Sequence, residues 1–154
     1  MREIRFRGKR DNGEWVYGSL ILNALSLCST GLLNGGITIN NRKYFTAILN
    51  KFDNLYQVDP NTVGQFTGLK DKKGQEICEG DVIALGSDWE KAKCEVTFRD
   101  GCFCIIAPWL VNNSLYAGDP TVELKTYCNR VFNEYLEIIS NIHDNPELLE
   151  SVRI

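Results

Sequence analysis

The strongest constraint in this sequence is a set of tight-turn signals that each separate two short apolar runs. Asp100-Gly101 stands between residues 94–98 and 102–106, and an Asp-Gly pair between alternating apolar residues is a strong signal for a β-hairpin. Asp11-Asn12-Gly13 predicts another hairpin over residues 3–20, and Asn40-Asn41 predicts one over residues 37–48. Short strands joined by such turns predict antiparallel sheets rather than alternating β and α units.

The rest of the chain extends this mainly β pattern. Expected strands cover residues 56–58, 63–69, 75–78, 82–85, 121–125, 127–132 and 135–142, although the last segment also fits helical spacing. Asn145-Pro146 combines a helix N-cap residue with proline at the first helical position, which predicts a short C-terminal helix. We expect a mainly β fold: a small SH3-like barrel, preceded by an N-terminal β-hairpin lobe and followed by that helix.

The length of 154 residues is typical of one domain. We therefore expect a single domain over residues 1–154. It would consist of an N-terminal β-rich lobe at 1–62, a barrel-like core at 63–143, and the short C-terminal helix and tail at 144–154.

Charge and hydropathy restrict the environment of the chain. Its formal net charge is −3, so the overall field repels polyanions such as nucleic acids. The most apolar stretch, residues 20–33, is too short to cross a bilayer, and the N-terminus lacks the apolar core of a secretory signal. We expect a cytoplasmic protein with no membrane partner and with its six cysteines reduced.

Two blocks of the sequence carry distinctive motifs. Residues 63–83 contain a Thr-Gly-Leu-x-Asp turn followed by an Ile-x-Glu-Gly-Asp turn, and residues 137–149 end in Asn-Pro-Glu-Leu-Leu. In this order, the two blocks resemble the YopX family of phage and prophage proteins, as does the N-terminal segment 4–7. The residues of this structural signature are Gly68, Asp71, Gly74, Glu79, Gly80, Asp81, Asn145 and Pro146.

The resemblance implies a mainly β fold, carriage on phages or integrated prophages, self-association, and no established enzymatic activity. It also implies a location in the cytoplasm of a bacterial host cell. The family offers no catalytic residues to transfer to this sequence. Residues 20–55 and 107–126 match no family pattern, so the resemblance predicts no function for them.

A cysteine-ligated metal site or an enzyme is an alternative interpretation. Cys78, Cys94, Cys102 and Cys104 could meet on neighbouring strands, but Cys102-x-Cys104 lacks the Cys-x-x-Cys spacing of structural zinc sites. Every classical nucleophile–base pair would need His143, the sole histidine, and no spacing supports one. We therefore interpret the cysteines as core thiols and predict no metal, no cofactor and no catalytic residue.

Glu76, Glu79 and Asp81 form an acidic group that could in principle carry acid–base chemistry. A carboxylate in a turn can also accept hydrogen bonds from nearby backbone N–H groups, and Gly80 relieves the backbone strain of such a turn. We favour the role in turn formation for these residues.

Arg5 and Arg7, with Trp15 on the expected partner strand, are the candidate binding residues. Basic and aromatic side chains on one surface can bind single-stranded nucleic acid, which makes a nucleic-acid-binding small barrel the second hypothesis. The negative net charge favours solvated arginines instead. The leading hypothesis is a non-catalytic phage or prophage accessory protein that associates with itself and binds another phage or host protein.

Overall fold

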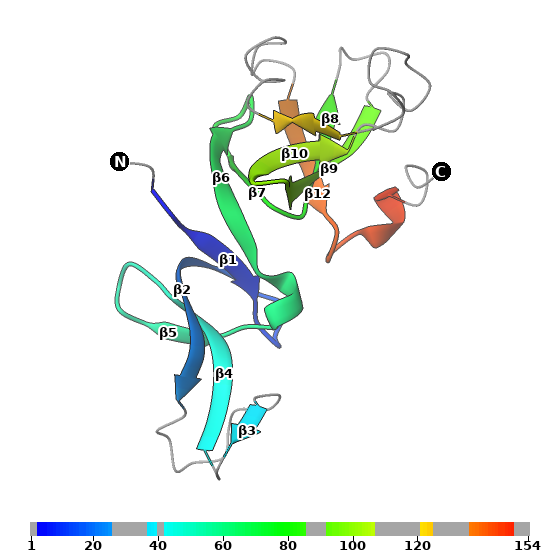
Figure 1. The fold of residues 1–154 in the computed structure, drawn as a ribbon. Coiled ribbons are helices and arrows are strands. Elements are labelled where there is room, and N and C mark those ends of the chain that lie inside the picture. Colours follow the sequence, from blue (N-terminus) through cyan, green and yellow to red (C-terminus); the bar gives the residue numbers. More distant parts are fainter. Residues whose placement is uncertain are drawn as a thin grey trace. The chain divides into compact units, whose positions relative to one another are not determined.

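The protein is mainly β, with antiparallel strands and almost no helix in the part of the chain that the structure describes (Figure 1). The computed structural model describes residues 3–25, 37–39, 42–85, 92–106, 121–124 and 136–149. The chain divides into two compact units, Met1–Gln65 and Phe66–Ile154. The predicted single domain over 1–154, with its three segments, stays a prediction.

Unit 1 is built around a long antiparallel hairpin. Strand β1 (Phe6–Lys9) pairs with β2 (Trp15–Leu25), and β2 pairs with β4 (Arg42–Leu49). The other side of β4 pairs with two short strands, β3 (Ile37–Ile39) and β5 (Leu55–Gln57). A 3-10 turn (Pro60–Thr62) follows β5, and the first residues of β6 (Gly64–Lys70) pair with β1.

One face of this sheet carries the core of unit 1. Val16, Ile48 and Val58 are buried there, because strand alternation turns them to the same side, and Phe6 and Leu20 pack against them. The opposite face carries Arg7, Trp15 and Tyr17, since Arg7 is the cross-strand partner of Tyr17 and Lys9 that of Trp15. The two faces of the hairpin therefore differ in chemistry.

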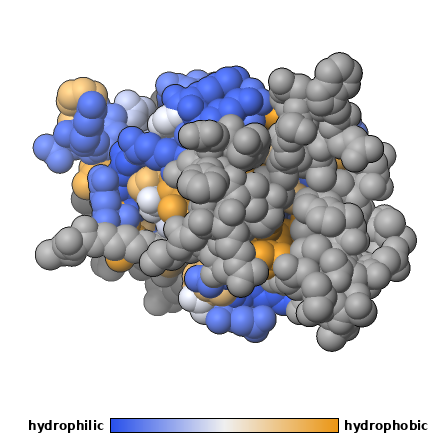
Figure 2. Space-filling view, turned by 90° about the horizontal axis from the view of Figure 1, so that it is seen from above, coloured by the Kyte–Doolittle hydropathy of each residue, from blue (hydrophilic) through white to orange (hydrophobic). Residues whose placement is uncertain are grey.

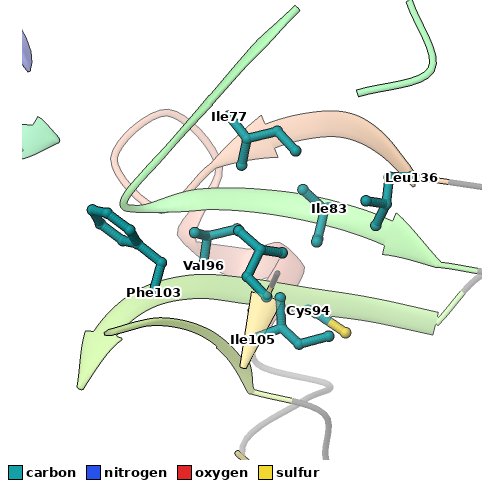
Figure 3. Packing of buried hydrophobic residues seen from close by; sticks show 8 residues of the cluster. Ile77, Ile83, Cys94, Val96, Phe103, Ile105 and Leu136 are labelled. Carbon is teal, nitrogen blue, oxygen red and sulfur yellow. The ribbon is translucent and has the colours of Figure 1, made fainter. Parts of the chain in front are cut away.

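Unit 2 contains an open antiparallel sheet. After β6, strand β7 (Glu76–Cys78) pairs back on β6. The sheet itself has the order β11 (Thr121–Glu123), β10 (Cys102–Ile106), β9 (Ala92–Arg99), β8 (Asp81–Leu85) and β12 (Leu136–Asn141). Its core contains Ile77, Ile83, Val96, Ile105 and Leu136, whose side chains point toward one another in Figure 3.

Several sequence-based expectations are confirmed. The hairpin around Asp11-Asn12-Gly13 is β1–β2, and the hairpin around Asp100-Gly101 is β9–β10. Strands β3 and β4 pair as expected, although their connection at 40–41 lies outside the described residues. Residues 135–142, which also fit helical spacing, contain a strand, β12. The expected strand at 127–132 falls outside the described residues.

Two finer expectations are not confirmed. Among the described strands, β11 and β12 form the two ends of the second sheet and do not pair with each other, so no closed SH3-like barrel is present there. The expected C-terminal helix corresponds to a 3-10 turn at Pro146–Leu149, and residues 150–154 are outside the described part. None of the helical segments described is long and apolar enough to cross a membrane.

Several large hydrophobic side chains remain on the surface. In unit 1 these include Tyr17, Leu22, Phe52 and Leu55. On the face drawn in Figure 2, hydrophobic residues are visible as separate patches among hydrophilic ones. Single exposed hydrophobic residues are normal on protein surfaces. Only a group of them around a pocket indicates a binding surface.

Candidate functional site: an aromatic pocket in unit 1

An open pocket of about 490 Å³ lies in unit 1. Three segments line it: the residues just before β1, the start of β2, and the turn between β4 and β5 together with Tyr56. Four aromatic side chains contribute, namely Trp15, Tyr17, Phe52 and Tyr56. This volume lies in the usual range for pockets that hold a small ligand or an anchoring side chain of a partner, about 300–1,000 Å³.

The turn between β4 and β5 exposes its aromatic residue, Phe52, to solvent. The Asn50 side-chain oxygen accepts hydrogen bonds from the backbone N–H groups of Phe52 (2.9 Å) and Asn54 (3.0 Å). Asp53 takes a positive φ of 59°, which an Asp tolerates in a tight turn. The Phe52 side chain is 71% exposed, and the Lys51 ammonium lies 5.0 Å from the centre of its ring. A rigid turn therefore presents an exposed phenyl ring at the pocket.

Trp15 is held by two cations on β1. The Arg7 guanidinium lies 4.8 Å from the centre of its rings and the Lys9 ammonium lies 5.9 Å away, both within cation–π range. Arg7 is only 6% exposed and does not line the pocket. Of the three candidate binding residues from the sequence, Arg5 and Trp15 line the pocket, while Arg7 fixes the position of Trp15.

Acidic side chains balance the basic ones around the pocket. The Arg5 Nε atom lies 2.9 Å from the Glu3 carboxylate, and Arg10 forms an ion pair with Glu14. Glu3 and Glu14 line the pocket, and so do Arg5 and Lys51. Two acidic and two basic groups give the lining a formal charge of zero. Such a pocket does not attract phosphate groups through its net charge.

Gly18 brings the two central strands of this unit close together at the pocket. A Cβ atom on Gly18 would lie 1.9 Å from the carbonyl oxygen of Leu49 on β4, a distance that no side chain tolerates. The missing side chain therefore lets the start of the β4–β5 turn approach β2. The exposed ring of Phe52 and that of Trp15 line one pocket because of this approach.

The signature residues of the sequence lie in unit 2 and do not line this pocket. Asp71 is 5% exposed, and its carboxylate accepts hydrogen bonds from the backbone N–H groups of Lys73 (2.9 Å), Gln75 (2.8 Å) and Ile138 (3.2 Å). It therefore ties the β6–β7 turn to β12. Gly74, in the same turn, takes a positive φ of 80°, and Gly68 takes 88° where the β6–β7 register shifts.

The Glu79-Gly80-Asp81 turn leads from β7 into β8. Asp81 is 1% exposed, and its carboxylate accepts a hydrogen bond of 2.7 Å from the backbone N–H of Cys78. Gly80 has a φ of 81°, donates to the Val96 carbonyl and accepts from the N–H of Ile142. Glu79 is half-buried in the same turn. These contacts are those of a turn that joins strands.

Asn145 and Pro146 lie where the chain leaves β12. The Asn145 side-chain oxygen accepts a hydrogen bond of 2.7 Å from the Ser140 hydroxyl, and its amide donates to the Glu147 carboxylate. This amide holds the pKa of Glu147 below its usual value. Asn145 therefore links the end of β12 to the 3-10 turn that follows it.

The alternative interpretation of the cysteines as metal ligands concerns Cys78, Cys94, Cys102 and Cys104. Within the described ranges, no group of three or more His, Cys, Asp or Glu side chains is arranged to hold a metal ion. Cys78 and Cys94 are buried, and Cys94 belongs to the core drawn in Figure 3. Burial raises the pKa of the Cys94 thiol strongly. Cys28 and Cys128 lie outside the described residues.

The β4–β5 turn is the part of the pocket that sequence reasoning missed. It falls in residues 20–55, for which neither strand patterns nor family motifs predicted a function. A usable signal was present: Phe52 lies in the middle of the polar run Asn50-Lys51-Phe52-Asp53-Asn54. An aromatic residue at the tip of an Asn- and Asp-rich turn has no core to enter, so it indicates an exposed contact residue.

Comparisons with known proteins point to one family. The family model described as YopX protein matches residues 5–150. Protein EF1440 from Enterococcus faecalis has a similar solved structure, with a TM-score of 0.51 and 21% identity over 97% of this chain and 99% of that chain. Protein yopX from Bacillus subtilis gives a TM-score of 0.47 and 20% identity over the same shares. No curated protein matches the sequence.

Proposed function

This chain belongs to the YopX family, and we propose that it is a non-catalytic protein-interaction module of a phage or prophage whose aromatic pocket binds a second copy of the chain. The observation that carries the proposal is the set of exposed hydrophobic side chains at this pocket. Phe52 is 71% exposed and Tyr17 is 50% exposed, and both line it. Leu55, directly after the turn, is 46% exposed.

The composition of the pocket supports a protein partner. Aromatic residues and arginine are enriched at the centres of protein–protein interfaces and supply most hot-spot residues. Trp15, Tyr17, Phe52 and Arg5 are residues of this kind. Because Asn50 fixes the turn before binding, the exposed Phe52 loses little backbone freedom when it is buried in a complex.

The charge pattern supports a second copy as that partner. A two-fold contact places the same surface patch against itself, so a patch with one dominant charge would repel its mate. The pocket carries both signs in equal number, and Arg5 of one copy can approach Glu3 or Glu14 of the other. Strand β5 also supports the proposal, because within the described strands it pairs on one edge only, with β4.

The same observations weigh against nucleic-acid binding. That hypothesis relied on Arg5 and Arg7 as phosphate ligands, yet Arg7 is buried at Trp15 and Arg5 lies against Glu3. Binding to a polyanion depends on positive charges that displace counterions, and the lining has none in excess. A gel shift with single-stranded DNA at low salt, lost on Arg5→Glu, would reverse this judgement.

The proposal assigns no reaction to the pocket. Its lining, as described, contains no cysteine, histidine or serine that could act as a nucleophile or as its base. The two carboxylates of the lining, Glu3 and Glu14, each lie in an ion pair with an arginine. The contacts of the pocket are therefore suited to binding rather than to a chemical step.

Light scattering coupled to size-exclusion chromatography tests the proposal over a concentration series. We expect the wild-type chain to give a mass above that of one copy. Phe52→Asp should shift the mass toward that of one copy, because it places a charge where the second copy would bury the Phe52 ring. Leu22→Asp is the matched control, since Leu22 is 65% exposed in the same unit but does not line the pocket. A wild-type chain that is monomeric at all concentrations refutes self-association; an oligomer unchanged by Phe52→Asp refutes the pocket as its interface.

A further inference from the structure

Cys102 and Cys104 form a close pair of thiols on β10. Their Sγ atoms lie 3.4 Å apart, because residues two apart in a strand project from the same face. Phe103, between them, projects from the other face into the core of unit 2 (Figure 3). The pair therefore lies on the side of β10 that does not form this core.

The two thiols differ in their access to solvent. Cys102 is partly exposed, and its Sγ atom lies 3.5 Å from the Arg99 carbonyl. Cys104 is 4% exposed. Burial, with a smaller contribution from the hydrogen bond to Cys102, raises the pKa of the Cys104 thiol to about 11. A reagent in solution therefore meets Cys102 first, with a protonated Cys104 beside it.

The backbone geometry allows a bond between these sulfurs but strains it. Two residues in an extended strand are about 6.6–6.8 Å apart between Cα atoms. That spacing is at the upper end of the range of about 4.4–6.8 Å found across disulfides. The sulfurs must also approach to about 2.05 Å, so β10 has to bend locally for the bond to close. Strained disulfides are reduced more readily than structural ones.

We propose that Cys102 and Cys104 are a redox-active dithiol that low-molecular-weight disulfides convert reversibly into an intrastrand disulfide. With oxidised glutathione as the oxidant, the Cys102 thiolate attacks one of its sulfurs and one molecule of reduced glutathione leaves. The Cys104 thiol then loses its proton to solvent and attacks Cys102 Sγ, which releases the second glutathione. Two protein thiols are thereby oxidised to one disulfide, and the glutathione disulfide is reduced to two thiols.

Mass spectrometry of trypsin-cleaved protein tests this proposal directly. Cleavage after Arg99 and Lys125 releases residues 100–125, which contain Cys102 and Cys104 and no other cysteine. The reduced full-length chain is treated with oxidised glutathione, alkylated with iodoacetamide under denaturing conditions and digested. We expect this fragment to be lighter by two hydrogen atoms and free of alkylation, and to regain two alkylated thiols after treatment with dithiothreitol.

Single substitutions separate the two steps. In Cys104→Ser, the first step has no resolving thiol, so we expect Cys102 to keep a glutathione adduct. In Cys102→Ser, we expect Cys104 to carry no glutathione adduct, because it is buried in the folded chain. It should then be alkylated by iodoacetamide once the chain is denatured. The result for the wild-type chain decides the proposal if either variant folds poorly. A wild-type fragment with a stable glutathione adduct, with two unreacted thiols, or joined to another fragment overturns it.

Discussion

Removing the Asp71 carboxylate should destabilise unit 2 by about 3 kcal/mol. Asp71→Ala deletes the acceptor of three backbone N–H groups while leaving the donors in place. Lys73 and Gln75 are exposed, so water can accept the hydrogen bonds that their backbone N–H groups lose. Ile138 is half-buried, so its N–H has poorer access to water. Hydrogen bonds to a charged group contribute about 1.5–3 kcal/mol each, and partial replacement by water lowers the sum of three to the stated value.

Urea denaturation and thermal unfolding, both followed by circular dichroism, measure this effect. A loss of about 3 kcal/mol corresponds to a decrease in Tm of about 6–12 °C for a chain of this size. Asp71→Asn should lose about half as much, because its carbonyl oxygen still accepts the two turn bonds while its amide faces the Ile138 N–H. Asp11→Ala, at an exposed turn in unit 1, is the control and should change little. An Asp71→Ala chain within about 0.5 kcal/mol of wild type would refute the reasoning.

Three further predictions concern the backbone, an ion-pair group and pH. Gly18→Ala should destabilise unit 1 by about 1–3 kcal/mol or more in the same urea assay, because the Cβ of the alanine would overlap the Leu49 carbonyl oxygen. An unchanged urea midpoint would contradict this. Glu137→Gln should change the urea midpoint little, because Lys73 is exposed to solvent, and should return the pKa of Lys73, which Glu137 raises across a 2.7 Å contact, toward its usual value, as NMR titration would detect. The free energy of unfolding should fall between pH 9 and 11, because the folded chain keeps the Cys104 proton up to a pKa of about 11 while the unfolded chain loses it near 9.0. Urea midpoints of Cys104→Ala that fall with pH as steeply as those of the wild type would contradict this.

Local chemistry explains why the hairpins were predictable from the sequence. Asp100-Gly101 provides the positive φ values that a tight turn needs, 51° and 85°, directly between two apolar runs. Such a turn fixes the register of its own strands without help from the rest of the chain. The pairing of β8 with β12 joins residues more than fifty positions apart, and no local signal encodes it. The expected SH3-like barrel depended on that kind of pairing.

The pocket was only half predictable for the same reason. Strand alternation correctly put Arg7 and Trp15 on one face of the β1–β2 hairpin, and Arg5 lines the same pocket as Trp15. It could not indicate that Arg7 would be covered, because burial depends on the neighbours that the fold supplies. Nor could it bring Phe52 to that pocket, since this depends on the pairing of β4 with β2 and on the close approach at Gly18.

The contacts separate the residues that shape the fold from those that can bind. Asp71 and Asp81 are buried and accept backbone hydrogen bonds, so changing them should alter stability before it alters any interaction. Phe52 is exposed on a turn that Asn50 holds from within, so changing its ring removes contact area and no internal hydrogen bond. If the proposed interface is correct, Phe52→Asp should change the oligomeric state but match the wild-type stability at dilutions where both chains are monomeric, because association itself stabilises the folded state. A loss of stability that persists in the monomer would instead mean that Phe52 supports the fold of unit 1.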